Sequence, residues 1–233
     1  MNFQLIWDNL GFFAQGAQLT IFLTIASLAL AFVASVPLAL ARNSANRYVS
    51  GAVAGYTLLF RGTPLLVQLF LIYYGLAQFD LVRESVLWPW LSSPLICVIL
   101  AFVLNTTAYT TEIFAGSLRH IPVGEIEAAK SFGMRPLAMT RHILLPAMLT
   151  RSLQLYGNET ILMMHATSLA STVTLLELTG VARNISLNRY VMLEPYVAIG
   201  VIYLVLSLVL VGIFRFAERR WASYLRRDQQ SAR

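Results

Sequence analysis

Three ionisable side chains, Arg61, Glu112 and Glu159, interrupt long apolar stretches of the sequence. A charged group inside a lipid bilayer is costly, so such residues usually pair with one another or bind a charged ligand. At 1.5 Å per residue, Arg61 lies about 14 Å into a segment that begins near Ala52, and Glu159 lies about 11 Å into one that begins near Ser152. These depths are compatible with one shared polar region. The alternative is structural: Arg61 serves as the charge partner of a carboxylate and touches no ligand.

Further polar residues accompany these charges. Asn105, Tyr109 and Glu112 are spaced i, i+4 and i+7, which places them on one face of a helix. Asn158 and Glu159 begin a second polar patch. One arginine with two glutamates leaves a surplus negative charge, and this favours a ligand with an extra positive group, such as arginine, lysine, ornithine or histidine.

The sequence contains no recognisable catalytic motif. The motifs HExxH, GxSxG and GxxxxGK[ST] are absent, and His120, His142 and His165 are scattered. The single Cys97 excludes a disulfide within the chain, and no Cys/His spacing indicates a metal site. We therefore expect a non-enzymatic chain that binds no cofactor of its own, so any ATP-driven work belongs to another protein.

The elements that would position these residues are membrane-spanning helices. Of the 233 residues, 58% are hydrophobic and 12% are charged, and the mean hydropathy is +0.67. A helix needs roughly 20 mostly apolar residues to cross a bilayer. On this basis the sequence predicts an all-α integral membrane protein, one domain over residues 1–233, with five transmembrane helices at about 20–40, 52–79, 94–116, 152–176 and 196–216.

The distribution of basic residues predicts the orientation. With the N-terminus outside and the C-terminus inside, the inner segments hold most of the 17 Lys and Arg residues. This bias explains the net charge of +6 without nucleic-acid binding. The inner basic residues are Arg42, Arg47, Arg119, Lys130, Arg135, Arg141, Arg151, Arg215, Arg219, Arg220, Arg226, Arg227 and Arg233.

The inner loop over residues 117–151 has the sequence features of two helices. Pro122 is suited to a helix start, Glu125 and Glu127 favour the positive end of its dipole, and Gly133 is suited to a left-handed C-terminal cap. A second helical run follows over 136–145, and Pro146 marks the start of another segment. The physical pattern leaves two interpretations open, an amphipathic hairpin on the lipid headgroups or a protein-docking element.

The motif residues are informative at this point. Glu127, Ala128, Ala129 and Gly133, followed by Ile143, Leu145 and Pro146, resemble the EAA loop of permease subunits in bacterial ABC importers. The segments FRGTPLLVQLFLIYYG (60–75), NTTAYTTEIFAG (105–116) and TSL (167–169) are similar to the polar amino-acid uptake family. Many relatives have Lys-Asp before TSL, whereas this chain has His165 and Ala166. That departure resembles the M-type subunit of histidine, lysine, arginine and ornithine permeases, or of opine permeases.

The resemblance implies a type I importer permease that works by alternating access in the bacterial inner membrane. Its loop would be a coupling helix, with Glu127, Ala128, Ala129, Gly133, Ile143 and Pro146 contacting a cytoplasmic ATPase dimer that holds ATP and Mg²⁺. The further partners would be a homologous Q-type permease subunit, a periplasmic amino-acid-binding protein and membrane lipid.

The resemblance also implies substrate-path candidates at Asn105, Tyr109, Glu112, Asn158, Glu159, His165, Thr167 and Ser168. For His165 a gate or a pH-sensitive role stands beside simple hydrogen-bonded packing. An ion-coupled secondary amino-acid transporter is the alternative function, although an odd number of spans does not divide into the two matching halves that are usual in such carriers.

Overall fold

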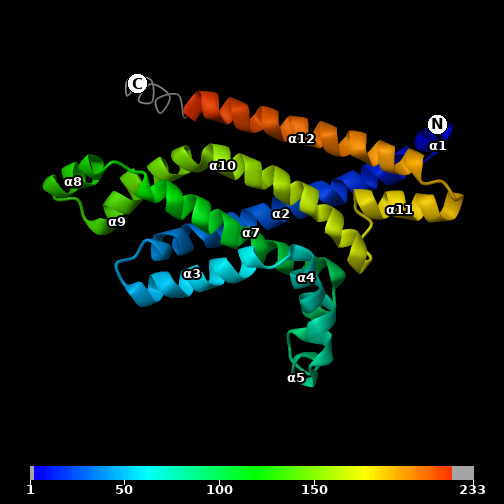
Figure 1. Ribbon diagram of the computed structural model, residues 1–233, viewed down its shortest axis with the longest axis horizontal. Coiled ribbons are helices and arrows are strands. Elements are labelled where there is room, and N and C mark those ends of the chain that lie inside the picture. The colour runs from blue at the N-terminus through cyan, green and yellow to red at the C-terminus, as the bar shows by residue number, and fades with distance from the viewer. Residues whose placement is uncertain (1–2, 222–233) are drawn as a thin grey trace.

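The computed structural model describes residues 3–221, and all regular elements within that range are helical, as predicted (Figure 1). The inner-segment residues Arg226, Arg227 and Arg233 lie outside this range. The α-helices are α1 (Phe3–Asp8), α2 (Leu10–Arg42), α3 (Arg47–Gly62), α4 (Leu65–Phe70), α5 (Asp80–Arg83), α6 (Trp88–Leu91), α7 (Pro94–Arg119), α8 (Val123–Ser131), α9 (Pro136–Met139), α10 (Leu145–Ala166), α11 (Leu178–Arg189) and α12 (Leu193–Trp221).

Three helices of the described chain, α2, α7 and α12, are individually long and apolar enough to cross a membrane. Two further segments pass the same test only as bent pairs, so the number of candidate spans is three, or up to five if each pair is one span. The most apolar window of α7 is 56% buried, whereas that of α12 is only 11% buried. Helix α7 therefore lies at the centre of the bundle and α12 lies at its periphery.

The second predicted span, 52–79, is broken. Helix α3 ends at Gly62, and the following arm, Leu65–Gln78, turns away from it by 99°. Pro64 stands at the break, and proline has no amide hydrogen with which to continue a helix. Beyond α4 the arm continues through a π-helical turn, Leu71–Gly75, and a 3₁₀ turn, Leu76–Gln78. In Figure 1 this arm projects from the bundle and carries α5 at its tip.

The fourth predicted span, 152–176, also differs from the structure. Helix α10 begins earlier, at Leu145, and is preceded directly by a π-helical turn over Thr140–Leu144. It ends at Ala166, and a 3₁₀ segment, Thr167–Val173, leads to Thr174 in a left-handed conformation with φ of 71°. Helix α11 then runs at 45° to the combined helical run Pro136–Val173, in the stretch between the fourth and fifth predicted spans.

Local capping explains why α11 forms. The buried carboxylate of Glu177 accepts hydrogen bonds from the backbone amides of Thr179 and Gly180, each at 2.9 Å. These amides belong to the first turn of the helix and have no partner within it. The hydroxyl of Tyr203 on α12 also donates to Glu177, at 3.0 Å. The cap therefore fixes the start of α11 against α12.

Candidate functional site

The predicted coupling loop folds as a helical hairpin of α8 and α9. Helix α8 ends in a full Schellman turn, in which the Gly133 amide donates to Lys130 O at 2.9 Å and the Met134 amide donates to Ala129 O at 3.1 Å. Gly133 has φ of +70°, so the predicted left-handed cap is confirmed. A side chain at this position would meet no atom within 4 Å, and its cost would therefore come from backbone conformation.

The EAA residues do not all face outward. Glu127 and Ala128 are exposed, but Ala129 is only 3% exposed and packs inside this chain. The expectation that both alanines offer a surface to a partner is therefore wrong for Ala129. Its small side chain instead allows α8 to lie close to its own bundle.

Apolar side chains that the sequence analysis did not select are exposed on the hairpin. Phe132 is 88% exposed, Leu137 is 81% exposed and Val123 is 66% exposed. Phe132 stands beside Gly133, Val123 begins α8 and Leu137 lies in α9; these positions provided a signal, because large apolar residues in a polar loop are unusual. Ile143 is half-buried in the π-helical turn, and Pro146 is exposed in the first turn of α10.

The hairpin is tied to the helices on both sides of it. Arg151 on α10 lies 3.6 Å from Glu125 on α8, measured between the guanidinium nitrogen and the carboxylate oxygen. At the end of α7, the Arg119 Nε donates to Asn43 Oδ1 at 2.8 Å, and Asn43 Nδ2 donates to Ala115 O at 3.0 Å. Displacement of the hairpin would therefore be transmitted directly to α10 and, through the end of α7 that precedes α8, to the end of α2.

The polar face of α7 forms a seam with α3. Asn105 donates to Phe60 O, Tyr109 donates to Arg61 O at 3.4 Å, and Glu112 accepts from Thr57 at 2.8 Å. The predicted shared face is thus confirmed, but it is packed against a neighbouring helix.

Asn105 and Gln68 hold the break between α3 and α4. Because Pro64 cannot donate to Phe60 O, this carbonyl lacks its helical partner. Asn105 Nδ2 donates to it at 2.9 Å, and Gln68 Nε2 donates to it at 2.8 Å. Asn105 Nδ2 also donates to Gln68 Oε1 at 3.0 Å, and Gln68 Nε2 donates to Thr63 O at 3.1 Å. The Asn105 amide group therefore has a structural task, and Gln68 is its unanticipated partner.

Glu112 is paired with Arg42 and not with Arg61. The Arg42 Nε lies 2.9 Å from Glu112 Oε1, and the same oxygen accepts from the Thr57 hydroxyl. Arg42 stands 70 residues away in the sequence, where it was assigned only to the inner loop. No signal in the sequence linked the two residues.

Arg61 has a different environment. Its guanidinium lies over the Tyr109 ring, 5.2 Å from the centroid, and it makes no ion pair within residues 3–221. Arg61 and the Arg42–Glu112 pair line an open cleft of about 480 Å³ between α3 and α7. The positive charge of Arg61 acts on both Glu112 and Glu159, so the expected polar region contains these groups.

Glu159 is buried without a partner. The residue is 8% exposed, and its carboxylate makes no hydrogen bond or ion pair in the described part of the chain. The antiparallel packing of α7 and α10 brings Thr106 to Met163 and Phe114 to Tyr156. Thr110 and Glu159 lie between these two contacts, and the buried Thr110 hydroxyl also has no partner among the described residues. The neighbouring Asn158 is exposed.

The remaining candidates lie at the end of α10. His165 Nε2 is 2.9 Å from the Ser207 hydroxyl on α12, and its ring packs edge-on against Tyr203. Because Ser207 donates to Tyr203 O, the assignment that fits has His165 Nε2 as the donor. The hydroxyls of Thr167 and Ser168, at the start of the 3₁₀ segment that follows, donate back to Met164 O and His165 O in the last turn of α10. This geometry favours the packing interpretation of His165.

Comparison with known proteins shows a consistent set of relatives. The chain is 42% identical over 226 residues to the histidine/lysine/arginine/ornithine transport system permease protein HisM of Escherichia coli (strain K12), covering 95% of this chain and 93% of that protein. It is 43% identical over 219 residues to the nopaline transport system permease protein NocM of Agrobacterium fabrum, covering 94% and 91%. The octopine transport system permease protein OccM of Rhizobium radiobacter is 41% identical, covering 93% and 88%.

Solved structures have the same fold. A crystal structure of an amino acid ABC transporter with histidines matches with a TM-score of 0.83 and 29% identity, covering 94% of this chain and 99% of that one. An inward-facing MetNI methionine ABC transporter matches with a TM-score of 0.66 and 19% identity, covering 94% and 97%, which shows the fold alone. The family described as binding-protein-dependent transport system inner membrane component matches residues 31–223. The chain therefore belongs to this family of inner-membrane permease components of ABC importers.

Proposed function

We propose that this chain is the permease subunit of an ATP-binding-cassette importer for cationic amino acids or opines. The observation that carries the proposal is the α8–α9 hairpin, which combines the EAA residues, the left-handed turn at Gly133 and exposed apolar side chains. The relatives are named as permease proteins for histidine, lysine, arginine and ornithine, for nopaline and for octopine. These names support cationic amino acids or opines as the substrate class.

The proposed topology has five spans, with the N-terminus outside and the C-terminus inside. Counting each bent pair as one span gives up to five. Figure 1 supports the orientation, because the α2–α3 connection, the α8–α9 hairpin and the end of α12 lie at the same end of the bundle. These are the segments rich in Lys and Arg, which face the cytoplasm under the positive-inside rule.

The coupling step in this proposal uses the exposed face of the hairpin. Phe132, Leu137 and Val123 would enter an apolar cleft on a cytoplasmic ATPase subunit, with Glu127 as a polar contact at the joint. ATP and Mg²⁺ would be bound by that subunit, since this chain has no P-loop. Closure of two ATPase subunits would move the hairpin and, through Arg151 and Asn43, the helices that surround the substrate region.

The substrate region that we propose centres on Glu159 and the cleft beside Arg61. Because Arg42 neutralises Glu112, the region holds two arginines and two glutamates, and the surplus negative charge predicted from the sequence disappears. Support for a cationic ligand therefore moves to Glu159, the buried carboxylate that lacks a hydrogen-bond donor in the described chain. A cationic amino acid could supply both a positive charge and several donors.

The projecting arm supports a second permease chain as partner. Along it, Leu71 is 63% exposed, Leu81 is 87% exposed and Val86 is 91% exposed. Exposed apolar side chains of this number usually mark a protein or membrane contact. A homologous Q-type subunit would cover the part of the arm within the membrane, and a periplasmic amino-acid-binding protein would contact its tip. Alternating access would then expose the substrate region to each side in turn.

Uptake by reconstituted vesicles tests this proposal. Arginine uptake should require ATP, the ATPase subunit and the soluble binding protein together, and omission of any one should reduce it to the level of empty vesicles. Uptake by this chain without those partners, driven by an ion gradient, would contradict the proposal and favour the secondary-transporter alternative.

A further inference from the structure

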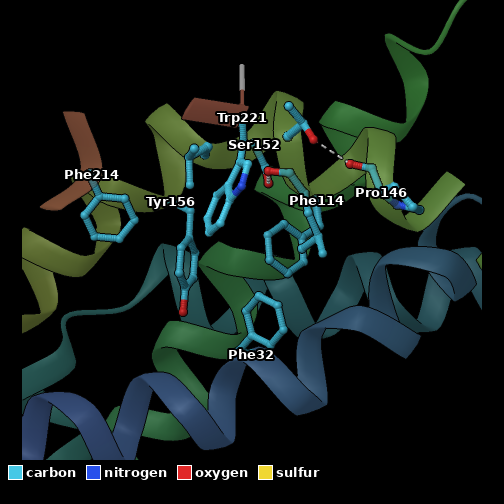
Figure 2. A pocket seen from close by; sticks show the side chains of 10 residues that line it. Phe32, Phe114, Pro146, Ser152, Tyr156, Phe214 and Trp221 are labelled. Carbon is cyan, nitrogen blue, oxygen red and sulfur yellow. Dashed lines mark hydrogen bonds between the residues drawn. The ribbon is translucent and has the colours of Figure 1, made fainter. Parts of the chain in front are cut away.

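Helices α10 and α12 cross closely at one point and then diverge. A Cβ atom added to Gly157 on α10 would lie 2.8 Å from the ring of Phe214 on α12. Toward the start of α10 and the end of α12, the helices leave a slot of about 370 Å³ between them. Figure 2 shows this slot, with the indole of Trp221 pointing into it between Tyr156 and Phe114.

The lining of the slot suits an apolar occupant. Its inner end is aromatic: Phe32 and Phe114 meet edge to face at 5.5 Å, and Tyr156 and Phe214 meet at 6.2 Å. None of the described lining residues is charged. The hydroxyls of Thr150 and Ser152 donate to Pro146 O and Leu149 O of their own helix, so neither has a hydrogen to offer a ligand. The remaining side-chain polar groups of the described lining, the Tyr156 hydroxyl and the Trp221 indole N–H, are neutral, so a charged metabolite would find no counter-charge here.

The slot begins at the level of the lipid headgroups. Trp221, at its mouth, is 65% exposed, and tryptophan is enriched where the membrane meets water. From Trp221 to Phe214 the slot extends about 10 Å along α12, so it begins in the headgroup region and reaches the edge of the hydrocarbon region, where the predicted span 196–216 ends. Because α12 is the peripheral helix, this depth is accessible from the surrounding bilayer.

Positive charges lie at the same level. Arg215, Arg219 and Arg220 are all exposed on the last turns of α12, and the one acidic residue of the described stretch 215–221, Glu218, lies among them and leaves a net positive charge there. The cytoplasmic leaflet of a membrane carries anionic lipids, and each basic residue near its surface attracts them. An apolar slot that opens to the edge of the hydrocarbon region, on a helix end with a net positive charge, is complementary to a phospholipid with a negative headgroup.

We propose that the slot binds one acyl chain of an anionic phospholipid from the inner leaflet, with the phosphate near the arginines of α12. The assignment to that leaflet rests on the orientation proposed above. The bound chain fills the space between α12 and the start of α10, which directly follows the coupling hairpin. The lipid therefore keeps these helices at a fixed spacing while the hairpin moves.

Photo-crosslinking tests the site in the intact assembly. The full-length chain with its partner subunits is placed in nanodiscs that contain phosphatidylglycerol or phosphatidylcholine with a diazirine on one acyl chain, at equal mole fraction. Labelled peptides are then located by mass spectrometry. We expect phosphatidylglycerol to label the slot residues more than phosphatidylcholine does, by about fivefold for each arginine that contacts the headgroup.

Two pairs of variants sharpen the test. Leu153→Trp fills the slot and should abolish the labelling, whereas Leu155→Trp, on the same helix but 57% exposed and outside the slot, should retain it. Arg219→Gln combined with Arg220→Gln should reduce the preference for phosphatidylglycerol, and Arg183→Gln on α11 should leave it unchanged.

Equal labelling by the two lipids, or labelling that survives Leu153→Trp, would overturn the proposal. Labelling that arises only after removal of residues 222–233 would show that this segment occupies the slot. Labelling that arises only without the second permease chain would show that this partner covers the slot. Either result would also contradict the proposal. The crosslinking measurement needs neither ATP nor substrate, so a negative result would contradict the lipid site but not the proposed importer function. Absence of ATP-dependent uptake in an assembly that is still labelled would contradict the importer function but not the lipid site.

Discussion

Glu112 and Glu159 differ in what surrounds their carboxylates. Glu112 has an ion pair with Arg42 and a hydrogen bond from Thr57, whereas Glu159 is buried with no such partner in the described chain. A buried charge without compensation destabilises a fold, and a paired one destabilises it only when its partner is removed. The two residues are therefore expected to respond oppositely to neutralisation.

Glu159→Gln and Glu112→Gln form a matched comparison of these environments. Glu159→Gln should leave the melting temperature of the purified assembly unchanged or raised, while reducing uptake of arginine by tenfold or more, about 1.4 kcal/mol. Glu112→Gln should lower the melting temperature, because it leaves the Arg42 guanidinium without its counter-charge. Normal arginine uptake by Glu159→Gln would show that this carboxylate does not contact the substrate.

The candidate residues also show which predictions the sequence could support. The left-handed turn at Gly133 was predictable because a helix cap depends on residues within one turn. The pairing of Glu112 with Arg42 was not, since the two residues meet only when α2 and α7 pack. Asn105 was selected for its polarity, but its amide is used at the break between α3 and α4, which only the three-dimensional structure reveals.

At the scale of the elements, the long apolar helices were the easiest to predict. Helices α2, α7 and α12 each contain a run that is apolar enough to span a bilayer, and their existence depends on composition alone. The break at Pro64 and the start of α11 depend on side chains that cap backbone groups. Thr63, Pro64 and Glu177 can be read directly from the sequence. The mean hydropathy of a long segment, however, hardly changes with such single residues, so it does not reveal the break or the cap.

Gln68→Ala tests whether the amide contacts maintain the 99° bend. The substitution removes one of the two donors to Phe60 O, the donor to Thr63 O and the acceptor of the Asn105 amide, and each such hydrogen bond contributes about 0.5–1.5 kcal/mol. We expect the melting temperature of the assembly to fall. Gln78→Ala is the control, because Gln78 lies exposed on the same arm and makes only one long hydrogen bond of 3.5 Å. Equal melting temperatures for the two variants would contradict this role.

At the scale of the whole molecule, the polar groups and the hairpin lie at separate levels of the same bundle. Helices α7 and α10 connect the two levels, since both contribute to the region around Glu159 and both adjoin the hairpin. The exposed arm and the exposed face of the hairpin are left for other chains to cover. This inner-membrane permease is thus built as one part of a larger assembly.

The most direct test of the account measures arginine uptake and ATP hydrolysis together in vesicles that contain the complete transporter with Gly133→Asp. Aspartate at φ of +70° strains the turn and places a charge on the docking face. We expect uptake to be lost and hydrolysis to stop responding to the loaded binding protein, while the chain remains inserted. Gly124→Asp, at an exposed position of the same hairpin without positive φ, adds the same charge without straining the turn and should impair both activities less than Gly133→Asp does. Normal uptake and normal stimulation of hydrolysis in Gly133→Asp would contradict the account.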